Sequence, residues 1–368
     1  MLTSEGIHSP GWLRLAEDLI VDVGPGTPPG SVEVDLGDAT VVPGFVDVHV
    51  HGGGSASFQS GSDEDVARVA AFHLSHGTTT MLASLVTDSV DRLSGIVARL
   101  SASVRAGLLA GIHLEGPWLS PAHAGAHDPS LLVPPTPGDL DRLLAAGDDT
   151  IRMVTLAPEL PGGLEAVRRL TESGVVAALG HTDATYDQAR AALDAGAAGG
   201  THVFNAMRGE HHREPGPVTA LLEHPEAWVE LIADGVHLHP AVLGLTAAHK
   251  PRRTLLVTDA MAAAGAGDGD YELGSMSVEV RGGVARLPGG AIAGSTLTMA
   301  AAVRYAVTVA GLPLEDAVRA ATATPATALG LERVGSLRPG FRADLVVLDG
   351  SLDVTRVMRG GAWVSPGT

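Results

Sequence analysis

The feature of this sequence that most limits its fold is an alternation of short β-rich runs with alanine-rich windows of helical periodicity. The windows, such as 63–76 and 163–173, begin with Asp, Glu or Thr caps or carry them close to their start, and repeat apolar residues at helical spacing. The runs occupy 41–51, 77–84, 108–116, 151–158, 175–182, 199–207, 229–235 and 254–260. Eight strands alternating with helices over about 220 residues predict an α/β fold, a (β/α)8 TIM-like barrel.

The main alternative to a barrel is a doubly wound parallel sheet. Such a sheet normally has fewer strands and a G-x-G-x-x-G turn after the first, and that spacing is missing here. After the eighth run, a Gly-rich, hairpin-like section at 265–294 precedes two predicted helices within 297–311 and 314–330. Both chain ends consist of short strands and tight turns. We therefore predict one small β-sandwich domain from 1–42 and 332–368, and a barrel from 43–331.

The charge and cysteine content exclude several classes of protein. The chain has 24 basic and 42 acidic residues, a net charge of −18, with no basic run and a single lysine, Lys250. Nucleic acids and anionic membranes attract clustered positive charge, so we expect neither as a partner. The absence of cysteine excludes disulfides and thiolate metal sites. Because no signal peptide and no long apolar stretch is evident, we expect a cytoplasmic location.

Residues suited to metal or proton chemistry fall at the carboxyl ends of the predicted strands, which form the catalytic face of such a barrel. The i, i+2 spacing of His49 and His51 turns both rings to the side that Asp47 shares. The others, Glu115, His181, His202 and Asp259, end the third, fifth, sixth and eighth runs. One strand-end histidine is more often a packed residue than a ligand. Five imidazole or carboxylate groups from four strands instead predict a metal site, because unpaired buried ionisable groups cost several kcal/mol.

Nitrogen and oxygen donors without sulfur restrict the metal to a divalent cation, zinc first, with iron, manganese or cobalt as alternatives. An open barrel mouth favours a catalytic site, where the cation lowers the pKa of bound water to about 7. Asp259 is then the base, unless it merely caps the segment that follows it. Many binuclear hydrolases on this barrel use a carboxylated lysine from the fourth strand as the bridge between metals. Here that strand ends in LAPE, so Glu115 is the candidate bridge.

The motifs around these residues resemble the N-acetylglucosamine-6-phosphate deacetylase family of the amidohydrolase superfamily, over nearly the whole chain. They are VPGFVDVHVHGGG (42–54), HLEGPWLSPAHAGAHDP (113–129), LGHTDATYDQA (179–189), THVFNAM (201–207), REPG (213–216), ADGVH (233–237), LVTDAM (256–261) and AGSTLTM (293–299). The resemblance implies that Glu115, His181 and His202 hold the main metal. It also implies a second metal on His49 and His51, with Glu115 shared, so that one or two cations are bound.

The resemblance also implies roles in binding a sugar phosphate. His127, with Ala126 beside it, contacts the sugar and polarises the acetamide carbonyl, and Asp259 is the acid and base. The phosphate contacts are the backbone amides of Asn205 and Ala206 and the side chains of Arg213 and His237; the substrate-facing loop holds Ile292, Ala293 and Gly294. Whether Arg213 acts in its own or a neighbouring subunit's site is open, and a homodimer is implied.

The implied activity is metal-dependent hydrolysis of N-acetyl-D-glucosamine 6-phosphate to D-glucosamine 6-phosphate and acetate, in amino-sugar catabolism and recycling. One alternative is deacetylation of a related N-acetylated amino sugar, the galactosamine epimer or an unphosphorylated form. A more distant alternative is a non-catalytic barrel-fold binding protein, which would be free to lose ligands. The presence of all five candidate ligands and Asp259 favours an enzyme.

Overall fold

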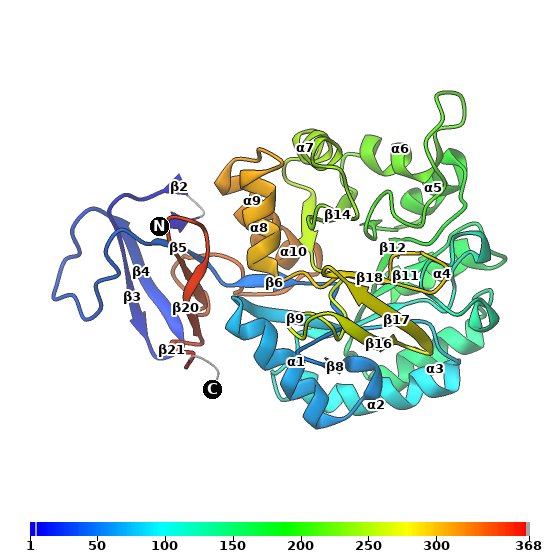
Figure 1. Cartoon of the computed structure of the whole chain (residues 1–368), viewed down its shortest axis with the longest axis horizontal. Coiled ribbons are helices and arrows are strands. Elements are labelled where there is room, and N and C mark those ends of the chain that lie inside the picture. Colours follow the sequence, from blue (N-terminus) through cyan, green and yellow to red (C-terminus); the bar gives the residue numbers. More distant parts are fainter. Residues whose placement is uncertain (4–5, 366–368) are drawn as a thin grey trace.

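The computed structural model describes residues 1–3 and 6–365 and contains one barrel with additional strands packed at its side (Figure 1). Eight parallel strands form one sheet, in which each strand pairs with its neighbours in chain order. The strands are β6 (Phe45–Asp47), β9 (Thr78–Leu85), β10 (Gly111–Glu115), β11 (Ile151–Leu156), β12 (Val176–Leu179), β13 (Gly199–Gly200), β14 (Trp228–Ile232) and β15 (Thr254–Val257). The predicted TIM-like barrel is thereby confirmed.

The barrel closes where its first and last strands meet. Val50 forms a parallel bridge with Ala260, and the Asp259 N–H donates to the His49 carbonyl at 2.8 Å. Below this bridge the Thr258 hydroxyl donates to Asp47 at 2.6 Å. Burial raises the pKa of Asp47 to about 7, although hydrogen bonds from Thr258 and His49 oppose the shift. Closure of the barrel thus places the segment with the candidate ligands His49 and His51 directly beside the segment with the candidate base Asp259.

Helices surround the barrel, and their starts follow the capping rules. The Ser62 hydroxyl accepts from the Asp65 N–H at the start of α1, and Thr185 and Gln188 form a capping box at the start of α5. The helices are α1 (Asp63–Ser75), α2 (Val90–Arg105), α3 (Pro137–Gly147), α4 (Gly163–Glu172), α5 (Tyr186–Asp194), α6 (Gly216–Glu223), α7 (Pro240–His249), α8 (Met299–Thr308), α9 (Leu314–Ala320) and α10 (Ala323–Ala328). No helix in the described ranges is long and apolar enough to span a membrane.

The region after the last barrel strand differs from the sequence prediction in one respect. The hairpin-like section is an antiparallel sheet of β16 (Gly269–Leu273), β17 (Met276–Arg281) and β18 (Val284–Arg286), as its glycines indicated. The prediction of a single helix within 314–330 was wrong, because α9 and α10 are separate. Pro325 lacks an N–H and is tolerated only in a first helical turn, so the chain breaks at Thr322 and restarts.

The two chain ends meet in one sheet. In this sheet β5 (Thr40–Pro43) pairs with β19 (Leu345–Leu348), which continues to β20 (Val354–Arg359) and β21 (Ala362–Trp363). The other N-terminal strands are β1 (Leu2–Thr3), β2 (Gly6–Ile7), β3 (Gly11–Ala16) and β4 (Leu19–Pro25). A separate apolar cluster joins these elements and includes Ile20, Val41, Leu337, Leu345 and Val347. The boundaries at 42 and 332, and the term sandwich, stay predictions.

Candidate metal centre and active site

A cavity of about 370 Å³ opens at the carboxyl ends of the barrel strands. The β16–β18 sheet forms part of its wall, since Leu273 lines it. Twelve of the fifteen predicted site residues line this cavity: His51, Glu115, Ala126, His127, His181, His202, Asn205, Ala206, His237, Asp259, Ile292 and Gly294. His49 lies behind this wall with no exposed surface, and Ala293 is likewise buried in the cluster beneath the small sheet.

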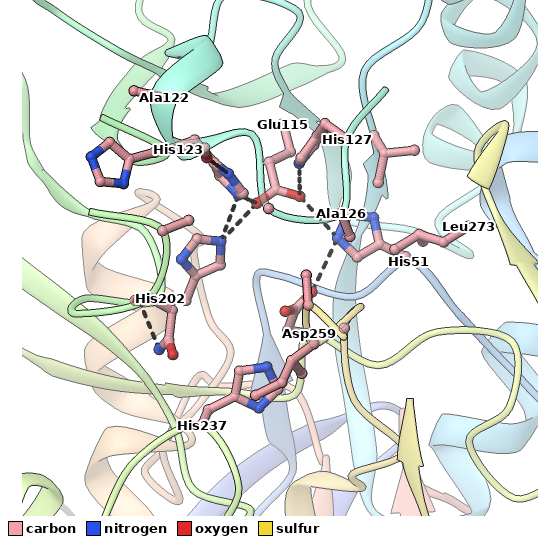
Figure 2. Close-up of a pocket in the computed structure, with 18 residues that line it drawn as sticks. His51, Glu115, Ala122, His123, Ala126, His127, His202, His237, Asp259 and Leu273 are labelled. Atoms are coloured by element: carbon pink, nitrogen blue, oxygen red, sulfur yellow. Dashed lines mark hydrogen bonds and ion pairs between the residues drawn. The ribbon is translucent and has the colours of Figure 1, made fainter. Parts of the chain in front are cut away.

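The two carboxylate oxygens of Glu115 face two different groups of ligand atoms (Figure 2). The first group, called here the His181–His202 set, contains Glu115 Oε1 with His181 Nε2 at 3.1 Å and His202 Nε2 at 2.9 Å. The second, the His49–His51 set, contains Glu115 Oε2 with His51 Nε2 at 3.2 Å and His49 Nε2 at 3.5 Å. Glu115 therefore has the arrangement of a carboxylate shared between two sites.

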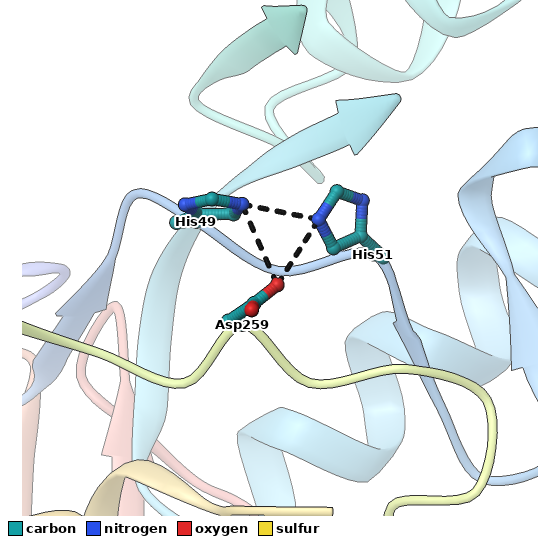
Figure 3. Close-up of side chains that lie close together, drawn as sticks. All are labelled: His49, His51 and Asp259. Atoms are coloured by element: carbon teal, nitrogen blue, oxygen red, sulfur yellow. Dashed lines mark hydrogen bonds and ion pairs between the residues drawn. The ribbon is translucent and has the colours of Figure 1, made fainter. Parts of the chain in front are cut away.

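Asp259 completes the His49–His51 set (Figure 3). Its Oδ1 lies 3.2 Å from His51 Nε2 and 3.5 Å from His49 Nε2, and those two nitrogens are 3.0 Å apart. Asp259 has a φ of 49°, and His181 and His202 have φ values of 47° and 28°. Non-glycine residues in this region carry roughly 1–3 kcal/mol of strain each and cluster at functional sites. The strand ends are therefore shaped to aim these side chains rather than to extend the sheet.

In three histidines the Nδ1 atom, which points away from the cluster, acts as a hydrogen-bond donor. His51 Nδ1 donates to the Ser84 carbonyl at 3.2 Å, and His181 Nδ1 donates to the His123 carbonyl at 2.8 Å. His49 Nδ1 donates to Glu230 at 3.1 Å. With neutral rings, these bonds place the Nε2 lone pairs of all three towards the carboxylates. The Nε2 lone pairs and the carboxylate oxygens then face one another. Because all of them are hydrogen-bond acceptors, this arrangement is stable only with a cation between them.

Without a bound metal, protons supply the positive charge between these groups. Burial lowers the pKa of His49, but the charges of Glu115 and Asp259 outweigh it and raise that pKa well above its usual range. Burial likewise opposes the charged form of Glu115, yet His49 holds the pKa of this carboxyl well below its ordinary value. Metal binding would release such protons, because a ligand imidazole must be neutral.

The donor set fits a divalent cation. Ligand atoms at about 2.0–2.1 Å from a tetrahedral zinc lie roughly 3.3 Å from one another. The distances in the two sets range from 2.9 Å to 3.5 Å. The His181–His202 set offers three protein atoms, the number found in catalytic zinc sites with an open position. Imidazole and carboxylate donors equally suit iron, manganese and cobalt.

His127 differs from the ligand histidines in its protonation. Its Nδ1 accepts the Thr87 N–H at 3.2 Å, so the proton of the neutral ring belongs on Nε2. One ring nitrogen of His127 lies within 4.8 Å of a carboxylate oxygen of Glu115 and a ring nitrogen of His181, but a protonated Nε2 makes His127 a donor rather than a ligand. Burial, followed by the nearby His181, lowers the pKa of His127 to about 4. At neutral pH it is an uncharged hydrogen-bond donor facing the cavity.

The predicted phosphate contacts are only partly brought together. The Asn205 N–H is already bonded to the His202 carbonyl at 3.0 Å, whereas the Ala206 N–H donates to no group within the described residues. Burial lowers the pKa of His237, but a 2.7 Å hydrogen bond to Asp234 raises it overall, which favours a cationic ring at the cavity wall. Arg213 lies outside the cavity, in the exposed segment 209–214, with its guanidinium against His212.

Several contributing residues were not predicted from the sequence. Glu230 on β14 is fully buried, and His123 lines the cavity while its carbonyl orients His181. A charged residue inside an apolar strand, VELI, was the available signal for Glu230. His113 on β10, two residues before Glu115, bonds Ser84 and Thr155 through both ring nitrogens. Its nitrogens are thereby unavailable to a metal.

Comparisons with known proteins agree with this geometry. The sequence profile of the amidohydrolase family matches residues 40–364. The chain is 40% identical to an N-acetylgalactosamine-6-phosphate deacetylase of Escherichia coli O157:H7, over 97% of this chain and 95% of that protein. It is 36% identical to an N-acetylglucosamine-6-phosphate deacetylase of Vibrio furnissii, over 88% and 82%.

Among solved structures, N-acetyl-D-glucosamine-6-phosphate deacetylase from Mycobacterium smegmatis is 53% identical, with a TM-score of 0.94 and coverage of 96% of this chain and 95% of that one. A mutant of the same protein was solved in complex with N-acetyl-D-glucosamine-6-phosphate. Identity at this level over nearly full length, together with the profile match, decides the relationship. The chain belongs to the amidohydrolase family and, within it, to the N-acetylglucosamine-6-phosphate deacetylase family.

Proposed function

We propose that this protein hydrolyses the amide of N-acetyl-D-glucosamine 6-phosphate, releasing acetate and D-glucosamine 6-phosphate. The observation that carries the proposal is the division of Glu115 between two sets of histidine nitrogens, with Asp259 against one set and a neutral donor, His127, beside them. The relatives named above, which act on N-acetylated amino-sugar 6-phosphates, support this substrate class. A non-catalytic barrel has no support from these features.

The protein's own residues supply binding and proton transfer. A bound divalent cation lowers the pKa of water to about 7 and polarises a carbonyl oxygen. Glu115, His181 and His202 would hold it, and His49 and His51 with Glu115 would hold a second. Asp259 is ionised, because His49 lowers its pKa although burial opposes this, so it accepts the proton of the attacking water and returns it to the departing amine. His127 donates its Nε2–H to the carbonyl oxygen as negative charge develops there.

The sugar phosphate is held at the other side of the cavity. The donors available to an anion there are His237, whose cationic form Asp234 favours, and the Ala206 N–H, which has no partner among the described residues. The Asn205 N–H would have to exchange its bond to the His202 carbonyl before it could contribute. Ala126, Ile292 and Gly294 line the remaining wall, with Ala293 buried behind it.

The direct test is to incubate the purified, metal-containing protein with N-acetyl-D-glucosamine 6-phosphate and to quantify acetate and free amine. Equal amounts of both products are expected. Asp259→Asn, prepared in parallel, serves as the control for a contaminating deacetylase. Protein that retains its metal and releases neither product would contradict the proposal.

The galactosamine epimer is a second candidate substrate, because one of the relatives reported above is an N-acetylgalactosamine-6-phosphate deacetylase. The two sugars differ only at C4, so the comparison should use kcat/KM for both epimers under the same metal conditions. We expect the glucosamine form to have the higher kcat/KM. A higher value for the galactosamine form would transfer the assignment to that epimer, and the unphosphorylated sugar would measure the contribution of the phosphate.

We also propose a homodimer in which Arg213 serves the partner's cavity. Arg213 is exposed and outside the cavity of its own chain, which supports this arrangement. Mixing Arg213→Ala subunits with Asp259→Asn subunits should then restore activity in sites that combine an intact Asp259 with an intact Arg213. Unchanged activity on mixing would place Arg213 in its own site or in no site. Zinc as the metal and a cytoplasmic location stay predictions, the first open to metal analysis of protein purified without chelator.

A further inference from the structure

Glu230 is a buried acidic residue that the proposed reaction does not use. It lies in the middle of β14, has no exposed surface and is surrounded in sequence by apolar residues. Burying a carboxylate in an apolar interior is unfavourable by several kcal/mol unless partners compensate. Its presence inside the barrel therefore calls for an explanation in terms of those partners.

One oxygen of Glu230 serves both candidate metal positions. Glu230 Oε2 accepts from His49 Nδ1 at 3.1 Å and from the His202 backbone N–H at 3.2 Å. His49 belongs to the His49–His51 set, whereas His202 belongs to the other set. The second oxygen, Oε1, has no hydrogen-bond partner among the residues that the structure describes. All hydrogen bonds of this carboxylate among the described residues therefore go to two candidate ligand residues, His49 and His202.

The bond to His49 has a specific consequence for metal binding. It places the ring proton on Nδ1, which leaves the Nε2 lone pair directed at Glu115 and Asp259. A carboxylate behind a histidine also makes that histidine a stronger ligand. No other ligand histidine has a carboxylate behind its ring in the described residues: His51 and His181 donate to carbonyls, and His202 Nδ1 has no partner.

Charge counting leads to the same position. Two divalent cations bring four positive charges, and Glu115 with Asp259 supply two negative ones, which leaves an excess of two in a buried site. Glu230 supplies one further negative charge within hydrogen-bond distance of His49. With a single cation, Glu115 and Asp259 already balance the charge. The negative charge of Glu230, as distinct from its hydrogen bond to the His202 N–H, therefore matters most when the second position is filled.

We propose that Glu230 is the positioning residue of the second metal position, acting through His49, and that it sets the affinity of the second cation without contacting it. This inference rests on the metal-dependent function proposed above. It predicts that Glu230→Gln, which retains an oxygen acceptor but loses the charge, lowers the affinity for the second cation by about ten- to a hundred-fold. The first cation should be nearly unaffected, because the amide oxygen can still accept the His202 N–H.

The experiment titrates metal-free, full-length protein with Zn²⁺ against a chromophoric chelator and resolves the two binding steps. His49→Gln identifies the second step, because it removes a ligand of that position alone. The decisive comparison is a double-mutant cycle, in which Glu230→Gln should change nothing further in the His49→Gln background. The visible absorption of the Co²⁺-loaded protein should lose the contribution of the second ion in the same variants.

A purely structural role for Glu230 makes different predictions. It would weaken both binding steps together, and equally in the presence and absence of His49. Asp344→Asn, which neutralises a buried carboxylate directly before β19 of the terminal sheet, controls for general loss of stability. Glu230→Leu provides a second variant should the Gln variant fold poorly. It should weaken the first step as well, because it leaves the His202 N–H without its acceptor. Its effect on the second step should still disappear in the His49→Gln background, which a purely structural role would not produce. An unchanged second step in either folded variant overturns the inference. Because no substrate is used, neither result depends on which sugar the enzyme deacetylates.

Discussion

The two ligand sets around Glu115 contain the same kinds of atoms but are held in place differently. The two histidines of the His181–His202 set lie in the turns after β12 and β13, with backbone strain at both and a main-chain carbonyl behind His181. The His49–His51 set lies at the seam between the first and last barrel strands, with Glu230 behind His49 and Asp259 in contact with both rings. The His181–His202 set thus has strained backbone and a main-chain acceptor, whereas the His49–His51 set depends on carboxylate side chains brought together from distant parts of the chain.

This difference indicates a division of labour. The His181–His202 set, with three protein atoms and a cavity in front, has the form of a catalytic metal position. The His49–His51 set includes Asp259, the proposed acid and base. The carboxylate of Asp259 therefore both contacts the second metal position and transfers the proton. Changes to the second set should therefore affect affinity and proton transfer together, whereas changes to Glu115 should affect both sets.

The largest effect is expected for Glu115→Gln, which alters both sets at once. The amide keeps the size of the side chain but removes the charge that attracts cations to both positions. We expect loss of metal from both and a fall in kcat of about a thousand-fold or more, since a metal supplies several kcal/mol to such reactions. Metal content and kcat should be measured on the same sample. Two cations retained in this variant would show that Glu115 is not the bridge.

Asp259→Asn should separate the two sets. The substitution removes the proposed acid and base, so kcat is expected to fall by about a hundred- to ten-thousand-fold. The His181–His202 set does not include Asp259, and its cation should remain bound. Metal analysis alongside steady-state kinetics tests both statements. Loss of all metal in this variant would mean that Asp259 acts mainly as a ligand.

His127→Leu should lower activity while leaving both sets intact. Removing one donor to a developing oxyanion typically costs about a hundred- to a thousand-fold in kcat. Because the pKa of His127 is about 4, the ring is neutral above about pH 5 and the ratio of wild-type to variant kcat should stay constant from there upward. A ratio that varies with pH near neutrality would contradict a neutral donor, and altered metal content would contradict its exclusion from the ligands.

The smallest effect concerns stability near the His49–His51 set. His73 on α1 bonds the Gly52 carbonyl at 2.9 Å, next to His51, and burial lowers its pKa from 6.5 to about 4. The unfolded chain therefore binds the proton more tightly, and the stability contributed by neutral His73 is present above about pH 6.5 and lost towards pH 4.

Metal-free wild-type protein should lose unfolding free energy when the pH falls from about 7.5 to about 5, in part because His73 becomes protonated on unfolding. In His73→Gln this loss should be smaller by roughly 1–2 kcal/mol. Denaturant unfolding at the two pH values measures it. His211→Gln, at an exposed histidine in the 209–214 segment, is the matched control and should leave the pH dependence unchanged. An equal effect in both variants would contradict the assignment to His73.

Much of the site was predictable because it follows from local patterns. A run such as LLAGIHLEG predicts a strand, and in a parallel barrel its carboxyl end faces the active site, so Glu115, His181, His202 and Asp259 could be placed together without coordinates. The strands proved shorter than the runs: β13 has only two residues, and His202 lies in a strained turn after it. Periodicity locates a strand but does not report where steric strain ends it.

The parts that escaped prediction depend on contacts between distant residues. The His49–Glu230 bond joins residues 181 positions apart, and the Asp47–Thr258 bond joins residues 211 apart. Neither residue type nor spacing indicates such a pairing. The position of Arg213 outside its own cavity, and the donor state of His127 set by the Thr87 N–H, are further examples.

The sequence by itself determined the eightfold alternation, the side of the barrel that carries the chemistry, and the absence of cysteine ligands, because periodicity and residue type are local properties of the chain. Only the tertiary structure decided which oxygen of Glu115 faces which histidines, which ring nitrogen carries each proton, and which buried carboxylate stands behind His49. Those depend on the closure of the barrel, which sets the distances between side chains that the sequence keeps far apart.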